Sequence, residues 1–89
     1  MLNAVKQALR IRSNMLDIEI SEMIESAKLD MTISGIKKID TEDKLIRRAI
    51  IIYCKANNGL DNKDSEKYQK SYDILVQRLA LCGEYNDVE

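Results

Sequence analysis

Four residue types are missing from this chain of 89 residues: proline, tryptophan, phenylalanine and histidine. The absence of proline removes the residue that most strongly interrupts helices. Alanine, leucine, isoleucine, lysine and glutamate are abundant instead, and this composition favours helix. We therefore expect an all-α fold, a small bundle of about four helices, from one end of the chain to the other.

The absence of histidine also restricts the chemistry that the chain can perform. A hydrolase or transferase site needs a positioned base, and histidine is the side chain most often used. A zinc site would need ligands beyond Cys54 and Cys82, and the sequence has no glycine-rich phosphate loop. Acid pairs such as Glu42 with Asp43 fit helix starts and solvated faces. We expect no enzyme, no metal site and no cofactor.

The two cysteines are expected on apolar helix faces, where a thiol behaves as a small hydrophobic group. Lys6, Arg10 and Arg12 interrupt any apolar run near the N-terminus, so no secretory segment is expected. No stretch has the length of a membrane span. We expect free, buried thiols, a cytoplasmic chain and no membrane partner.

The length fits one domain, which we expect to cover residues 1–83. Residues 84–89 form a short acidic tail with the composition of a mobile segment.

The formal net charge of −1 provides no overall attraction to nucleic acid or to an anionic membrane. Two basic pairs stand out, Lys37 with Lys38 and Arg47 with Arg48. Each pair is either solvated surface or a contact to phosphate groups that does not read sequence.

The spacing of apolar residues predicts a first helix over residues 1–11 and a second over residues 15–34. Asn14, with Asp17 three positions later, reads as the N-cap of the second helix. This helix carries one apolar stripe, formed by Leu16, Ile20, Met23, Ile24, Ala27 and Met31.

The other sides of the second helix are acidic, but three apolar residues lie off the stripe: Ile18, Leu29 and Ile33. They are either stray apolar residues on a solvated face, or, for Leu29 and Ile33, a contact with a neighbouring subunit. Gly35 ends the helix in the position that favours a left-handed residue.

The connector of residues 36–41 alternates enough to form a short extended segment. Its two apolar residues, Ile36 and Ile39, either enter the core or add to the backbone of a partner. Asp40 or Thr41 is expected to cap the next helix.

The third helix contains the stretch KLIRRAIIIYCKA over residues 44–56, and Asn57-Asn58-Gly59 is expected to close it. Residues 49–54 carry no charge, and a helix that is apolar all round must be covered all round. The other segments of a short chain are expected to be too few for this, so that copies of the chain cover the remainder. After a loop at residues 60–64, a fourth helix is expected over residues 63–82, with Gly83 as its stop and a stripe of Tyr68, Tyr72, Leu75, Leu79 and Cys82.

Taken together, these segments resemble the small head–tail connector proteins of long-tailed double-stranded DNA phages, also described as head-completion, adaptor or DNA-packaging proteins. The short first helix that closes on Leu9-Arg10-Ile11 is similar to the opening of that family. The acidic second helix, the turn at Gly35 and the apolar helix from Leu45 to Ala56 match its central part. Ser71-Tyr72-Asp73 resembles the closing segment of members from phages of Gram-positive bacteria. The basic turn at residues 12–14 and the short loop at residues 60–64 depart from the family pattern.

The resemblance implies a structural protein of the virion neck that assembles in the host cytoplasm. About a dozen copies would form a closed ring beneath the portal protein, extend the DNA channel and provide a docking surface for the next neck or tail-completion protein. DNA would pass without sequence recognition, along an acidic wall that does not hold phosphate groups.

On this basis we assign candidate residues to three surfaces. Subunit contacts are expected at Leu29, Ile33, Ile36, Ile39 and Ile51. Channel-facing or DNA-proximal positions are Glu19, Glu22, Lys37 and Lys38. Portal contacts are expected at Glu84, Tyr85, Asn86, Asp87 and Val88. The alternative function is a small helical DNA-binding or packaging-accessory protein that uses Lys37, Lys38, Arg47 and Arg48.

Overall fold

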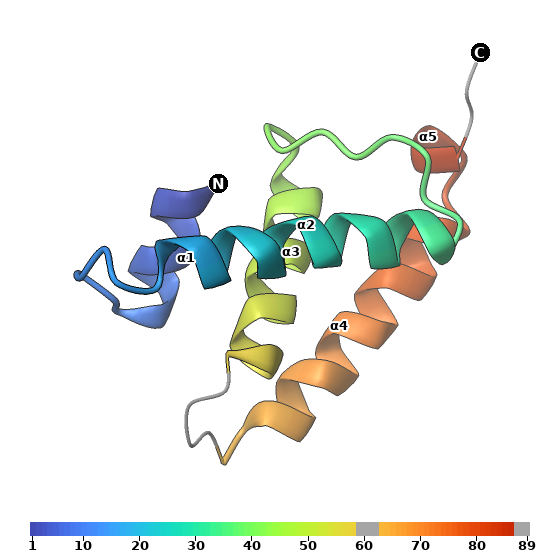
Figure 1. Ribbon diagram of the computed structural model, residues 1–89. Coiled ribbons are helices and arrows are strands. Elements are labelled where there is room, and N and C mark those ends of the chain that lie inside the picture. Colours follow the sequence, from blue (N-terminus) through green and yellow to red (C-terminus); the bar gives the residue numbers. More distant parts are fainter. Residues whose placement is uncertain (59–62, 87–89) are drawn as a thin grey trace.

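The computed structural model describes residues 1–58 and 63–86. These residues contain no strand, and the prediction of an all-α bundle is confirmed. The helices are α1 (Leu2–Leu9), α2 (Asp17–Ile33), α3 (Lys44–Asn57), α4 (Ser65–Ala80) and the single turn α5 (Gly83–Asn86). Helix α2 passes in front of α3 in Figure 1, and α4 runs from the far end of α3 back towards α5.

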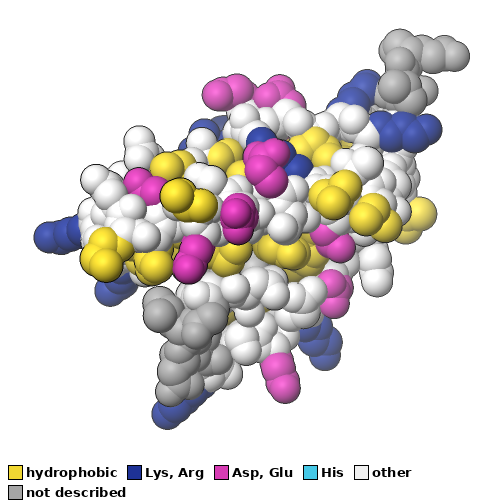
Figure 2. All heavy atoms as spheres, in the orientation of Figure 1, with side chains coloured by type: hydrophobic (Ala, Val, Ile, Leu, Met, Phe, Trp, Pro, Cys, Tyr) yellow, Lys and Arg dark blue, Asp and Glu magenta, His cyan; other side chains and the backbone are white. Residues whose placement is uncertain are grey.

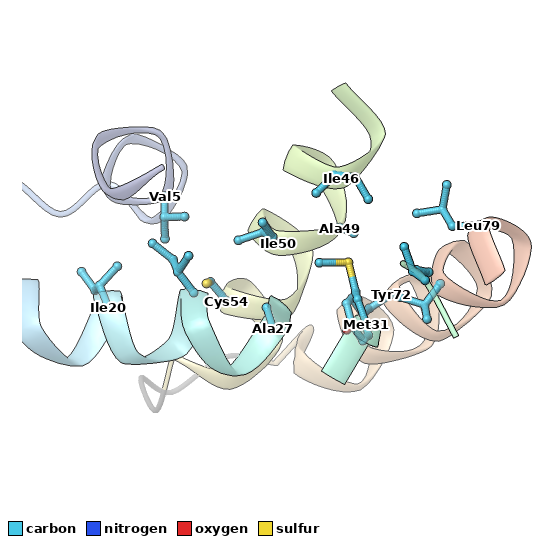
Figure 3. Close-up of a cluster of buried hydrophobic side chains, with 13 residues drawn as sticks. Val5, Ile20, Ala27, Met31, Ile46, Ala49, Ile50, Cys54, Tyr72 and Leu79 are labelled. Atoms are coloured by element: carbon cyan, nitrogen blue, oxygen red, sulfur yellow. The ribbon is translucent and has the colours of Figure 1, made fainter. Parts of the chain in front are cut away.

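Helix α3 is the centre of the bundle, because α1, α2 and α4 all pack against it. The core draws on these four helices and on the connector, and its ten labelled members converge in Figure 3. Each fully buried isoleucine stabilises the fold by roughly 1.5–3 kcal/mol relative to an exposed one. The buried residues of the core are Val5, Ile20, Ile24, Ala27, Met31, Ile36, Ile46, Ala49, Ile50, Cys54, Tyr72, Val76 and Leu79.

The apolar run of α3 is covered within one chain more fully than its sequence predicts. Ala49, Ile50 and Cys54 are buried, whereas Ile51, Ile52 and Tyr53 are half-buried and pack against the core. The expectation that a single chain lacks the segments to cover this helix is therefore wrong for its inner side. On the outer side Ile51 and Ile52 do remain partly exposed, as expected. Much of that side, however, is formed by Lys44, Arg48 and Lys55, which need no cover.

Two predicted N-caps are wrong. Helix α3 begins later than expected, and Asp43 caps it by accepting hydrogen bonds from the backbone N–H groups of Leu45 at 2.8 Å and Ile46 at 3.2 Å. Helix α2 begins at Asp17 without a side-chain cap. Asn14 and Asp17 meet Lys6 of α1 instead: the Lys6 ammonium donates to Asn14 Oδ1 at 2.9 Å and lies 2.8 Å from Asp17 Oδ1 as an ion pair.

The turn after α2 explains why the connector stays with its own chain. Gly35 has a φ of 107°, which favours glycine, as predicted. The next N–H group, that of Ile36, donates to Met31 O at 3.0 Å and places the Ile36 side chain in the core. Ile39 is half-buried against the core. Of the two alternatives for the connector, entry into the chain's own core is the one observed.

The register of α4 differs slightly from the predicted stripe. Tyr72, Val76 and Leu79 are buried, whereas Leu75 is only half-buried. Helix α4 ends at Ala80, and Gly83 begins α5 instead of closing α4. Of the expected close of α3, Gly59 lies outside the described residues, as does most of the loop at residues 60–64.

Candidate functional site

The side of α2 that faces away from the core carries an apolar and acidic surface. Leu29 follows buried Ile20 by nine positions, or about two and a half turns, so Leu29 lies opposite the core. Ile18, Leu29 and Ile33 are 77%, 62% and 76% exposed. We define the outer α2 face as Ile18, Glu22, Glu25, Leu29 and Ile33. In Figure 2, hydrophobic and acidic side chains alternate across the middle of the surface, where α2 lies.

The acidic groups of the outer α2 face are only partly neutralised within the chain. Glu25 Oε2 lies 3.0 Å from Lys28 Nζ, in an exposed pair that contributes little to stability. Glu22 forms no ion pair with any residue of the described ranges. Glu22 and Glu25 line a shallow hollow together with Ile18. An exposed apolar surface with embedded carboxylates is suited to a partner that supplies both apolar groups and cations.

A second surface with the opposite charge lies between α3 and α4. This groove of about 650 Å³ is lined by four cations, and between them lie Leu45, Ile51 and Ile52. We define the basic groove by these three apolar residues together with Lys44, Arg47, Arg48, Lys55, Tyr68 and Ser71. The Lys55 ammonium lies 5.4 Å from the centre of the Tyr68 ring, a cation–π contact that joins α3 to α4.

The C-terminal turn α5 holds the connector in place. The backbone N–H groups of Lys37 and Lys38 both donate to Tyr85 O, at 2.9 and 3.0 Å. The Tyr85 hydroxyl donates to both carboxylate oxygens of Asp43, at 3.2 and 3.1 Å. Partial desolvation raises the pKa of Tyr85, and its hydrogen bond to the Asp43 carboxylate raises it further. Tyr85 therefore links the C-terminal turn to the connector through its backbone carbonyl and to the start of α3 through its hydroxyl.

The pKa of Asp43 reflects its role as a cap. Partial desolvation raises this pKa, but the hydrogen bonds from the Ile46 and Leu45 backbone and from Tyr85 outweigh it. The net pKa lies below the usual value of 3.8, so Asp43 is ionised at neutral pH.

The cysteine and tyrosine side chains of the core stabilise the fold and are not set up for chemistry. Burial raises the pKa of the Cys54 thiol to about 11, so this thiol is protonated and unreactive at neutral pH. Both cysteines are free, as predicted, with Cys54 buried and Cys82 half-buried. The buried Tyr72 hydroxyl donates to Asp30 Oδ2 at 2.6 Å and connects α4 to α2.

Within residues 1–58 and 63–86, no group of histidine, cysteine or acidic side chains has the arrangement of a metal site. No helix in these residues is long and apolar enough to cross a membrane.

The structure places the five predicted subunit-contact residues in three environments. Leu29 and Ile33 are exposed on the outer α2 face, and Ile51 is half-buried in the basic groove. Ile39 is half-buried against the core. Ile36 is 0% exposed, so its side chain belongs to the chain's own core and is not accessible to a neighbouring copy.

The predicted channel and portal residues are also separated. Glu19 and Glu22 are exposed on α2, whereas Lys37 and Lys38 are exposed on the connector and line none of the groove around Arg47 and Arg48. Glu84 is exposed on α5, and Tyr85 and Asn86 are half-buried. The Asn86 side-chain amide donates to Ala80 O. Asp87 and Val88 lie outside the described residues.

Three features of these surfaces were missed from the sequence. Ile18 lies off the predicted stripe and is not among the predicted contacts, although its spacing from Leu29 places both on one side of the helix. Lys44, Arg48 and Lys55 recur at steps of four and seven, which places them on one side of α3. Tyr85 is predicted only as a portal contact, and no sequence signal points to its contacts with the connector and Asp43, because these depend on the folded chain.

A comparison with protein families finds one match that spans the described chain. The family model described as phage connector protein matches residues 1–86. No curated protein and no solved structure matches the chain significantly.

Proposed function

This chain belongs to the phage connector protein family, and from that premise we propose that its copies form a ring beneath the portal protein of the virion. The family assigns the chain a structural role between head and tail, as a component of the virion. In our proposal about a dozen copies close into the ring, since subunits that meet through two different patches can close by rotation. The ring extends the DNA channel and docks the next neck component.

The observation that carries this proposal is the outer α2 face. The chain already has a complete core, with α3 surrounded by three other helices. It nevertheless leaves Ile18, Leu29 and Ile33 mostly exposed along one side of one helix. Large apolar side chains that stay exposed along one side of a helix support a contact with another protein. The proposal assigns that contact to assembly of the neck.

The channel wall is proposed to be acidic. Glu19 is exposed on α2 and has no ion-pair partner in the described ranges. Carboxylates repel phosphate groups, so DNA could pass without being held. Lys37 and Lys38 are proposed to lie near the DNA at the end of the channel, where a few cations would bind phosphate only weakly. The portal contact is proposed for the end of the chain, through the exposed Glu84 and residues 87–88.

Loss of the protein during phage assembly tests this function. Heads that package DNA without it are expected to lose the genome and to lack tails, because both the channel extension and the docking surface are missing. Expression of the wild-type chain in the same cells should restore both properties. Purified chain and portal protein should form one complex whose images show a ring of copies. Tailed, filled and infectious particles without the protein would contradict the proposal.

A DNA-binding or packaging-accessory role is the second candidate, and the basic groove is the observation that favours it. Lys44, Arg47 and Arg48 form no ion pair with any described residue, so their charges are free for phosphate groups. Binding of short duplex DNA by the isolated chain at low and moderate salt separates the two functions. Steeply salt-dependent binding that is lost in Arg48→Glu would favour the DNA-binding role, whereas negligible binding supports the ring.

A further inference from the structure

We propose that the outer α2 face of one copy docks into the basic groove of the next, so that copies associate head to tail. This inference rests on the proposed function for one premise, that copies of the chain assemble. It adds which two surfaces meet and in which direction.

The two surfaces match in composition. The outer α2 face combines three exposed apolar side chains with the carboxylates Glu22 and Glu25. The basic groove combines apolar side chains with four cations. Each surface therefore offers the other apolar contact and opposite charge, and both are needed for a specific, well-oriented interface.

The charges that would pair are available in the free chain. Glu22 has no ion-pair partner in residues 1–58 and 63–86, and the same holds for Arg47 and Arg48. A pair formed between copies would therefore replace contacts with water and not an ion pair inside the chain. Charges at the edge of the interface would orient the encounter, and the apolar residues would provide most of the buried area.

The basic groove is long enough to hold most of the outer α2 face. From Ile18 to Ile33 the outer α2 face extends about 22 Å along the helix axis at 1.5 Å per residue. Lys44 and Lys55, which mark the ends of the groove along α3, are separated by about 16 Å on the same basis. An amphipathic helix can therefore lie along the groove for most of its length, as in other helix-in-groove contacts.

The two surfaces lie on opposite sides of the molecule, which determines the kind of assembly. Helices α2 and α3 pack against each other through their buried sides, and α2 lies in front of α3 in Figure 1. The outer face of α2 is directed away from that contact. On α3, Arg48 and Ile52 each follow a buried isoleucine by two positions, or about 200° around the helix, so the groove faces the other way. A contact between two different surfaces on opposite sides continues from copy to copy and closes into a ring when the rotation permits.

The apolar residues of the groove favour a protein occupant over DNA. Phosphate contacts require cations but gain nothing from Leu45, Ile51 and Ile52 beneath them. The chain as a whole has a net charge of −1, which does not attract DNA. Under this inference Glu22 belongs to the contact between copies, and Glu19 remains the candidate for the channel wall.

A charge-reversal series tests the pairing. Glu22→Lys and Arg48→Glu each place like charges opposite one another, so each is expected to weaken self-association by roughly tenfold or more. The double variant, with both substitutions in one chain, is expected to recover association because the pair is restored in reverse. An equimolar mixture of the two single variants should also associate, since each offers the surface that the other needs. Association is measured by sedimentation at increasing concentration, and by the number of copies bound per portal ring.

Two exposed positions outside both surfaces provide matched controls. Glu66→Lys and Lys70→Glu, both on the exposed side of α4, make the same charge changes and should leave self-association and loading onto the portal unchanged. Circular dichroism checks that all variants retain the helical content of the wild type, as expected for exposed positions.

Each outcome has a distinct consequence. A wild-type chain that neither associates nor loads onto the portal overturns both this inference and the proposed function. Wild-type assembly with no effect of Glu22→Lys and Arg48→Glu, or no recovery in the double variant, overturns this inference alone. Loss of DNA binding in Arg48→Glu with unchanged self-association would identify the groove as a phosphate site and would also overturn it.

Discussion

Helices α2 and α3 pack against each other but differ in what their outward sides carry. Helix α3 contacts three other helices, and its outward side carries Lys44, Arg48 and Lys55. Helix α2 lies at the surface, and its outward side carries isoleucine, leucine and carboxylates. The helix with the longest apolar run is therefore the better covered one. The arrangement of apolar residues around a helix, more than their number, determines which surface is left for a partner.

The largest difference between the two helices should appear on removal of a single aliphatic side chain. Ile50→Ala leaves a cavity at a fully buried position of α3 and should lower the free energy of unfolding by about 2–5 kcal/mol. Leu29→Ala removes a similar volume from the exposed side of α2 and should change it by less than about 0.5 kcal/mol. Denaturation by urea, followed by circular dichroism, measures both. Equal destabilisation by the two substitutions would remove the distinction between the helices.

A smaller effect is expected at the hydrogen bond between the side chains of Asp30 on α2 and Tyr72 on α4. Tyr72→Phe removes the hydroxyl that donates to Asp30 at 2.6 Å and should cost about 1.5 kcal/mol of stability. Tyr68→Phe is the matched control, because it keeps the ring beneath Lys55 and should have little effect. A neutral Tyr72→Phe would mean that burial alone holds α2 against the bundle.

The smallest effect concerns how the two helices begin, since α3 has a side-chain cap and α2 has none. The pKa of Asp43 is lowered in the folded chain, so its stabilising contribution is present above the unfolded pKa near 3.8 and is lost as the pH falls through the lower folded value. Asp43→Ala should therefore lower the thermal midpoint at neutral pH. The difference from the wild type should shrink as the pH is lowered below the usual carboxyl pKa. A difference that does not change with pH would show that the carboxylate charge is not what caps α3.

The sequence predicts the inner sides of the helices well, because burial follows helical spacing directly. The apolar stripe of α2 is confirmed, with Ile20, Ile24, Ala27 and Met31 all buried. Gly35 was also predicted correctly, since its position requires a left-handed residue. Helix starts were predicted less well: several acidic or polar residues near α3 could have capped it, and only the folded geometry selects Asp43.

The candidate surfaces were harder to predict, because they depend on which helix covers which. Ile36 has the same residue type and a similar context to Ile39, yet one is fully buried and the other only half-buried. The basic groove requires α3 and α4 to lie side by side, which no local pattern specifies. The hydrogen bond of Tyr85 to Asp43 joins residues 42 positions apart, beyond the range of any sequence periodicity.

The central claim is that the chain completes its core around α3 and leaves the outer α2 face for another protein. Carbene footprinting tests it most directly, applied both to the free chain and to the chain assembled on the portal. We expect Leu29 and Ile33 to be labelled in the free chain and protected in the assembly, while Ile50 stays unlabelled in both. Labelling of Ile50 in the free chain, or equal labelling of Leu29 and Ile33 in both states, would contradict this account.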